Sequence, residues 1–310
     1  MSPETPAFLD PRLTERRNPR SHDLDARSSL ELVDLINAED TTVPAAVGRA
    51  REALATAIDL VEAAFRAGGR LLYVGAGTSG RLGVLDAAEC VPTFSVPPGM
   101  VVGIIAGGAP AILKAVEGAE DDVNGGAAAL DSHQVGPNDV VIGIAASGTT
   151  PFVRGALGRA QTIGAKSVFL SCAEPPQLLK ETCDLCITIL TGPEVLTGST
   201  RMKAGTATKL ALNIISTGAM VKLGKSYGNL MVDLTATNSK LVDRSERILM
   251  ETTGADRAKA RAALDAAGGS VKTAIVMLRR GLARPDAEKL IAEHHGKLRP
   301  IVGPPPDVTG

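Results

Sequence analysis

The sequence predicts an α/β fold in which a parallel five-stranded sheet is flanked by helices and followed by a small C-terminal helical appendage. Between residues 70 and 190, short apolar segments alternate with helical patterns, as in βαβ units. Hydrophobic residues make up 44% of the 310 positions but aromatic residues only 2%. Such a core of small aliphatic residues is typical of parallel strands covered by helices. A shift in composition near residue 250 marks the start of the appendage.

The segments before the sheet are an irregular arm and two helices. Residues 1–27 are polar and rich in Arg and Pro, and residues 28–38 read as a short helix capped by Ser28 or Ser29. Apolar residues then recur at three- and four-residue steps over residues 44–67, which predicts one long helix. The expected divisions of the chain are an arm with a short helix (1–43), a sheet domain (44–250), a three-helix appendage (251–296) and a disordered tail (297–310).

Five strands and their connecting helices follow. The candidate strands are residues 71–74, 101–105, 140–144, 166–171 and 185–190. The candidate helices are residues 80–89, 110–130, 151–163, 176–182 and 201–223, and in the appendage 256–267, 270–281 and 284–295. Strands joined through helices form right-handed crossovers and a parallel sheet, and ligands bind at the carboxyl ends of such strands.

Two loops at expected strand ends are rich in glycine and in hydroxyl groups. The first strand runs into Gly75-Ala76-Gly77-Thr78-Ser79-Gly80-Arg81, and the strand at 140–144 runs into Ala145-Ala146-Ser147-Gly148-Thr149-Thr150-Pro151. Backbone N–H groups and hydroxyls in such turns bind phosphate. The sequence therefore predicts a phosphorylated small molecule as the ligand.

The first loop also fits G-x-G-x-x-G, the fingerprint of dinucleotide-binding proteins. That fingerprint expects an acidic residue at the end of the next strand, but this strand ends in Ala106-Gly107-Gly108. A nicotinamide-dependent dehydrogenase is therefore an alternative with weaker support. A third reading is that the glycines only form a tight turn between strand and helix.

Residues 197–206 precede the helix at 201–223 and allow two interpretations. Ser199 and Thr200 suit the N-cap of that helix. Alternatively, Arg201 and Lys203 form an anion site beside the helix N-terminus. The sequence alone does not separate the two.

Two groups of carboxylates are candidates for catalysis. Glu89 lies among small apolar residues after the first loop, and a second acidic cluster covers residues 117–122. Within that cluster, Asp121 and Asp122 have the character of solvated surface groups. Two carboxylates around one sugar divide acid and base roles if burial raises the pKa of one of them. General acid–base chemistry on a sugar phosphate is thus the favoured reaction class.

The composition argues against several other classes. The net charge is −1, from 33 basic and 34 acidic residues, which gives no basic surface for nucleic acid or anionic membranes. No apolar run reaches the 18 residues of a membrane helix, and the N-terminus lacks signal-peptide features, so a cytoplasmic protein is expected. Cys183 and Cys186 fit C-x-x-C without a second pair, and we favour packed thiols over a redox or metal site, with no metal expected.

Further motifs extend along the chain and support a family resemblance. They are Thr14-Glu15-Arg16-Arg17-Asn18, Ile36-Asn37-Ala38-Glu39-Asp40, the stretch from Tyr73 to Gly83, Asp86-Ala87-Ala88-Glu89-Cys90, the stretch from Ala115 to Asp121, the stretch from Gly198 to Thr206, and the stretch from Gly228 to Asp233. With these motifs the chain resembles the N-acetylmuramic acid 6-phosphate etherases of the sugar isomerase (SIS) domain superfamily, over about residues 14–296. The glycine loop is shared by the superfamily, whereas its combination with Glu89 and Glu120 is specific to the etherases.

The resemblance implies cleavage, without a cofactor, of the D-lactyl ether at carbon 3 of N-acetylmuramic acid 6-phosphate, in recycling of cell-wall sugar. By the family pattern, Glu89 protonates the departing lactate oxygen and Glu120 takes the proton from carbon 2, although the division of roles stays open. The residues that would hold the sugar phosphate are Gly77, Thr78, Ser79, Ser147, Gly148, Thr149, Thr150, Ser199 and Thr200.

The resemblance leaves a second functional class and implies an assembly. The glucokinase regulatory protein resembles the etherases, so a sugar-phosphate sensor without catalysis is an alternative. Relatives form homodimers whose ligand sites lie near the partner. A homodimer is therefore expected here, with the helices at 44–67 and 201–223 offering apolar surface.

Overall fold

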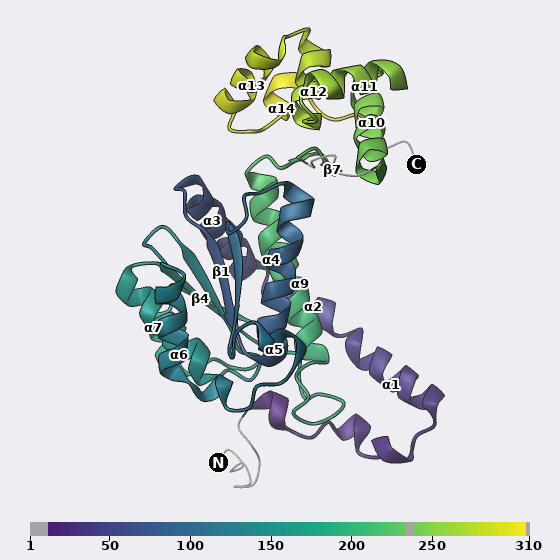
Figure 1. Cartoon of the computed structure of the whole chain (residues 1–310). Coiled ribbons are helices and arrows are strands. Elements are labelled where there is room, and N and C mark those ends of the chain that lie inside the picture. The colour runs from purple at the N-terminus through teal and green to yellow at the C-terminus, as the bar shows by residue number, and fades with distance from the viewer. Residues whose placement is uncertain (1–11, 234–238, 308–310) are drawn as a thin grey trace. The chain divides into compact units, whose positions relative to one another are not determined.

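The computed structural model describes residues 12–233 and 239–307 (Figure 1). The chain divides into two compact units. The first comprises the described residues up to Ala88 together with Gly99–Ser216, and the second comprises Glu89–Pro98 together with the described residues from Thr217 onward. The boundary expected at residue 250 differs from this division, because residues that precede it, such as Tyr227 and Leu249, pack in one core with the C-terminal helices.

The first unit is built around the predicted five-stranded parallel sheet. Its strands are β1 (Leu71–Gly75), β2 (Val101–Ile105), β3 (Val140–Ile144), β4 (Lys166–Ser171) and β5 (Leu185–Thr188). They lie in the order β2-β1-β3-β4-β5. Gly75 at the end of β1 pairs with Ile105 of β2 on one side and with Ile144 of β3 on the other. The winding thus reverses between β1 and β3, where sheets of this order bind ligands.

The helices that begin in the first unit are α1 (Ser29–Asp40), α2 (Val43–Arg49), α3 (Arg51–Arg66), α4 (Gly77–Phe94), α5 (Pro110–Leu113), α6 (Val123–Ser132), α7 (Pro151–Ile163), α8 (Gln177–Thr182) and α9 (Lys203–Lys222). Ser28 caps α1, as predicted, and Glu31 completes a capping box. The arm contains the short 3-10 turns η1 (Leu13–Glu15), η2 (Pro19–Ser21) and η3 (Leu24–Ala26).

Helices cover both faces of the sheet because alternate strand residues point in opposite directions. Leu72 and Val141 pack with Phe152 of α7 on one face, where Figure 1 shows α6 and α7. On the other face, a β-carbon added to Gly83 of α4 would lie 2.7 Å from Cβ of Tyr73. Only glycine allows α4 to approach β1 this closely.

Two of the helices that the sequence predicts as continuous are interrupted in the structure. The helix expected at 44–67 is divided at Ala50, whose backbone leaves helical geometry, into α2 and α3. The helix expected at 110–130 is also interrupted, because Lys114 is extended and Gly118 adopts a φ of 73°. A 3-10 turn, η4 (Ala119–Asp121), follows before α6 begins. This interruption places Glu120 on a connecting loop rather than on a helix face.

The second unit is a helical bundle with a short hairpin. Leu249, Val271 and Ile275 are fully buried at its centre. The three helices expected in the appendage are confirmed, and α10 precedes them. Its elements are β6 (Ser226–Tyr227), β7 (Leu230–Met231), α10 (Ser239–Thr253), α11 (Arg257–Ala266), α12 (Val271–Arg280), α13 (Arg284–Glu293) and α14 (Arg299–Val302).

The expectation of a disordered tail from residue 297 is wrong for most of that segment. Leu298, Ile301 and Val302 are buried around α14. The Tyr227 hydroxyl also donates a hydrogen bond to the carbonyl oxygen of Gly303, at 3.0 Å. The burial of these three apolar side chains thus holds the segment in place, and residues 308–310 lie outside the described part of the chain.

Candidate active site

The first glycine loop forms a tight turn from β1 into α4. Gly77 has a φ of 51°, which favours glycine. A β-carbon on Gly80 would lie 2.6 Å from Cγ1 of Ile105 and 2.7 Å from the carbonyl oxygen of Gly75. Thr78 and Ser79 lie in the first turn of α4 and are half-buried. The glycines therefore shape the turn, and the hydroxyls lie at the helix N-terminus, where anions bind.

The second loop joins β3 to α7 in the same way. Gly148 has a φ of 88° and donates its backbone N–H to the carbonyl oxygen of Ala145, at 2.9 Å. The hydroxyl oxygens of Ser147 and Thr149 lie 3.5 Å apart, and Thr150 is the N-cap residue of α7. Because β1 and β3 are neighbours in register, both loops leave the sheet at the reversal of winding.

The segment before α9 lies against the first loop. A β-carbon on Gly205 would lie 3.5 Å from the methyl group of Thr78. Ser199 and Thr200 are half-buried in the turn that precedes Gly205. The sequence-predicted residues Thr78, Ser199 and Thr200 are therefore brought to one region.

Lys203 is not a free cation at this helix N-terminus. Its side chain is 3% exposed, and its Nζ lies 2.6 Å from Oε2 of Glu39. Of the two interpretations that the sequence left open for this segment, the one in which Lys203 helps to form an anion site is not supported, because the charge of Lys203 is already paired inside the protein. Arg201 is exposed.

Glu120 lines a small pocket beside the first loop. The pocket has a volume of about 180 Å³, and its lining includes Gly77, Arg81 and Lys114 as well as Glu120. Glu120 itself is exposed. A carboxylate thus shares one pocket with a loop whose geometry suits a phosphate.

Arg81 is a member of this pocket that the sequence did not single out. Its Nε donates to the carbonyl oxygen of Ile112, at 2.9 Å, and its Nη2 to that of Lys114, at 3.4 Å. These carbonyls lie where α5 ends and the loop to Glu120 begins. Arg81 therefore ties α4 to the loop that carries Glu120. Its place in the glycine-loop motif was the available signal.

Glu89 lies on α4, in the part that belongs to the second unit, and its side chain is exposed. In the sequence, Glu89 lies among small apolar residues, and we expected that one of the two carboxylates would be buried and so shielded from solvent. Within a single chain neither Glu89 nor Glu120 is buried, so the expected shielding is not present there.

Asp86 has a structural role that the sequence did not predict. Its side chain is buried and accepts hydrogen bonds from the Tyr73 hydroxyl at 2.8 Å, the Asn213 amide at 2.6 Å and the Ser216 hydroxyl at 3.2 Å. These three donors come from β1 and α9. Asp86 thus joins the strand that leads into the first loop to two helices.

The cysteines are packed, as expected. Cys90 and Cys172 are buried, and Cys183 and Cys186 are half-buried. Burial raises the pKa of the Cys183 thiol to about 11 and that of Cys172 to about 12, which disfavours the reactive thiolate. Over residues 12–233 and 239–307, no helix is long and apolar enough to cross a membrane.

Comparison with known proteins decides the family. A relative from Serratia proteamaculans named N-acetylmuramic acid 6-phosphate etherase is 54% identical over 287 residues, which is 93% of this chain and 96% of that protein. Relatives of the same name from Gloeothece citriformis and Edwardsiella ictaluri are 53% and 52% identical, over 93% and 95% of this chain and 94% and 98% of their own. The chain belongs to the N-acetylmuramic acid 6-phosphate etherase family. It is therefore an enzyme of the carbon–oxygen lyase class, which decides against the dehydrogenase.

A domain model agrees with this membership. The glucokinase regulatory protein N-terminal SIS domain matches residues 53–161, which contain β1, β2 and β3. Among solved structures, the NanR protein of Vibrio vulnificus complexed with ManNAc-6P aligns at 17% identity with a TM-score of 0.46, over 64% of this chain and 66% of that one. Phosphoheptose isomerase from Neisseria gonorrhoeae aligns at 14% identity with a TM-score of 0.46, over 62% and 98%.

Proposed function

We propose that this etherase-family enzyme cleaves the D-lactyl ether of N-acetylmuramic acid 6-phosphate and releases N-acetylglucosamine 6-phosphate and D-lactate. The observation that carries the proposal is the pocket shared by Gly77 and Glu120. It brings a carboxylate, which can accept a proton, beside a loop that can bind a phosphate. Relatives named for this reaction, more than half identical to the chain over nearly its whole length, support the choice of substrate.

The proposed reaction is an elimination of lactate followed by an addition of water, assisted by proton transfers and without a redox step. Opening of the sugar ring exposes an aldehyde at carbon 1, which acidifies the proton on carbon 2. Glu120 takes that proton, the bond between carbon 3 and the ether oxygen breaks, and Glu89 protonates the departing lactate. Water then adds to carbon 3 of the unsaturated aldehyde, and carbon 2 regains a proton. Each acid or base contributes about 10²–10⁴-fold to the rate.

The phosphate would lie between the helix N-termini at the reversal of winding. Three groups of donors are available there: the hydroxyls and N–H groups at the start of α4, those before α7, and those of the turn before α9. Two phosphate charges are stabilised at such positions by N–H groups and by the helix dipole. The residues proposed for this contact are Gly77, Thr78, Ser79, Ser147, Gly148, Thr149, Thr150, Ser199 and Thr200.

Release of D-lactate from N-acetylmuramic acid 6-phosphate tests the proposal. We expect the wild-type protein to release lactate, and we expect Glu120→Gln and Glu89→Gln to lose at least about 100-fold in kcat because an amide transfers no proton. Asp121→Asn is the matched control, because Asp121 is exposed in the same 3-10 turn but does not line the pocket.

Two outcomes would contradict the proposal. Absence of lactate from folded wild-type protein that still binds N-acetylglucosamine 6-phosphate would favour the sugar-phosphate sensor. Full activity in both Glu variants would leave the proposed reaction supported but would overturn the assignment of Glu89 and Glu120 as the catalytic pair.

Assembly and location stay predictions. A homodimer is supported by an apolar hollow of about 300 Å³ lined by Val47, Leu54, Ile58 and Ile214, among others. These residues lie on the two helical segments that the sequence expects to contribute to the interface. Action in the cytoplasm, and a role in recycling cell-wall sugar, are part of the same proposal.

A further inference from the structure

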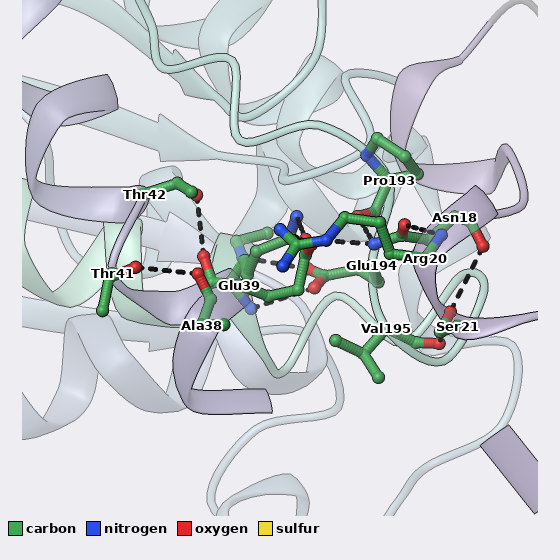
Figure 2. Close-up of polar contacts among 12 residues, drawn as sticks. Asn18, Arg20, Ser21, Ala38, Glu39, Thr41, Thr42, Pro193, Glu194 and Val195 are labelled. Carbon is green, nitrogen blue, oxygen red and sulfur yellow. Dashed lines mark hydrogen bonds and ion pairs between the residues drawn. The ribbon is translucent and has the colours of Figure 1, made fainter. Parts of the chain in front are cut away.

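A cluster of buried polar side chains lies outside the residues proposed to touch the substrate (Figure 2). Its centre is Glu39, at the C-terminal end of α1, with a side chain 6% exposed. Glu39 Oε2 accepts hydrogen bonds from Lys203 Nζ at 2.6 Å and from Asn18 Nδ2 at 3.0 Å, and Oε1 accepts from Arg20 Nη1 at 2.8 Å. The arm, α1 and α9 thus meet at one carboxylate.

A second buried carboxylate, that of Glu194, caps the N-terminus of α9. Glu194 is 0% exposed, and its two oxygens accept the backbone N–H groups of Lys203 at 3.0 Å and Ala204 at 2.9 Å. The first N–H groups of an α-helix have no partner within the helix. The start of α9 is therefore held twice, through its backbone by Glu194 and through the Lys203 side chain by Glu39.

The arm reinforces the segment that leads into α9. Asn18 Nδ2 donates to the carbonyl oxygen of Pro193 at 3.4 Å, and the Ser21 hydroxyl donates to that of Val195 at 2.7 Å (Figure 2). The backbone N–H of Gly198 donates to the carbonyl oxygen of Thr14 at 3.2 Å. Residues 193–198 are thus hydrogen-bonded to the arm along their length.

The segment that the arm holds in this way leads into the turn that lies against the first glycine loop. Ser199 and Thr200 lie between the part bonded to the arm and Lys203. Two residues beyond Lys203, Gly205 lies beside the first glycine loop, because a β-carbon added to it would be 3.5 Å from the methyl group of Thr78. Breaking a buried ion pair leaves an uncompensated buried charge and is strongly destabilising, so the Lys203 ammonium is kept beside Glu39. A shift of the Lys203 side chain would therefore move the turn that presents the hydroxyls of Ser199 and Thr200.

We infer that Glu39, Lys203 and Glu194 are positioning residues that hold Ser199 and Thr200 at the binding site for the phosphate of the substrate. The inference rests on the proposed function in that it takes this site to bind a sugar phosphate. None of the three side chains is proposed to touch the ligand, because each is buried and already bonded within the protein.

The test compares two buried carboxylates from different units. Glu39→Gln keeps the shape of the side chain but removes its charge and leaves Lys203 without its anionic partner. Glu246→Gln is the matched control, because Glu246 is 2% exposed, is paired with Arg257 and Arg261, and lies on α10 in the second unit. Binding of N-acetylglucosamine 6-phosphate is measured by calorimetry on both variants and on the wild type.

We expect Glu39→Gln to raise the dissociation constant of N-acetylglucosamine 6-phosphate about tenfold or more, and KM by more than it lowers kcat. Glu246→Gln is expected to change the dissociation constant less than twofold. The double variant Glu39→Gln with Lys203→Met removes the charges of both residues, and it should recover part of the affinity because Lys203 is no longer left as an unpaired buried charge. Asn18→Ala, which leaves the ion pair in place, should give a smaller loss than Glu39→Gln.

The inference is overturned if folded Glu39→Gln binds the sugar phosphate as tightly as the wild type, or if Glu246→Gln weakens binding equally. If Glu39→Gln does not fold, Asn18→Ala decides, and unchanged affinity in that variant counts against the inference. Because binding of the product is read without turnover, a wild type that binds it but releases no lactate would contradict the proposed function and leave this comparison intact.

Discussion

Among single residues, three carboxylates of the first unit couple its stability to pH. Burial of Asp139 opposes its ionisation, but hydrogen bonds from Arg70 and from backbone N–H groups outweigh burial and lower its pKa. The same balance, with Lys166 and Ser167 as partners, lowers the pKa of Asp184, and Lys203 and Asn18 lower that of Glu39. The pKa of Glu194 is shifted in the opposite direction, because burial raises it.

The three lowered pKa values predict an acid-sensitive unit. A carboxyl whose pKa is lower in the folded state stabilises the protein above its unfolded pKa, and that stability is lost as the pH falls through the folded value. We expect the free energy of unfolding to be nearly constant from pH 7 to about 5 and to fall below about pH 4. Urea unfolding at pH 7 and pH 3.5 checks this. Asp139→Asn should reduce the difference between the two pH values, and an unchanged difference would contradict the assignment.

Single residues also show where sequence reasoning is limited. The hydroxyls of the two loops could be predicted because each follows an apolar strand directly in the sequence. The pairing of Lys203 with Glu39 could not, because 164 positions separate them and a lysine near a helix N-terminus looks the same whether it is solvated or paired. Asp86 belongs to one of the family motifs, but its three hydrogen-bond donors come from segments that are distant in the sequence, so its structural role could not be predicted.

Among the elements, strands were more predictable than helix continuity. Each parallel strand is a short apolar run, so β2, β3 and β4 have the expected bounds. The interruption between α5 and α6 depends on the left-handed backbone of Gly118, and glycine is also common in helices that continue. That interruption creates the loop on which Glu120 lies, so the candidate base could be named from the sequence whereas its placement could not.

The loop between α5 and α6 gives a prediction about Arg81. Its guanidinium bonds the carbonyl oxygens of Ile112 and Lys114, so Arg81→Ala should loosen the loop that carries Glu120. We expect kcat to fall about tenfold or more, because a misplaced base transfers a proton less efficiently. Arg81→Lys keeps the charge but loses the paired donors, and it should recover little. Steady-state kinetics of lactate release measure both variants.

The outcome for Arg81→Lys separates two roles. A positioning role predicts that the lysine variant resembles Arg81→Ala. If Arg81→Lys has nearly wild-type activity, the charge of Arg81 in the pocket matters rather than its bonds to the loop.

For the whole molecule, the predicted homodimer has a concrete test. The apolar hollow on α2, α3 and α9 is exposed to solvent in a single chain, and Ile214 at its edge is 39% exposed. We expect light scattering to give twice the 31.9 kDa chain mass, and Ile58→Glu to shift the protein toward the monomer because burying a charge there is costly. A wild-type mass of one chain at micromolar concentration would contradict this prediction.

The most direct test of the proposed reaction is to let the enzyme convert N-acetylmuramic acid 6-phosphate in D₂O and to follow the products by NMR. If Glu120 removes the proton on carbon 2 before the ether bond breaks, D-lactate appears and the N-acetylglucosamine 6-phosphate formed carries deuterium at carbon 2. Glu120→Gln should give neither signal, and Asp121→Asn should give both. Lactate release with the original proton retained at carbon 2 would contradict elimination and, with it, the role proposed for Glu120.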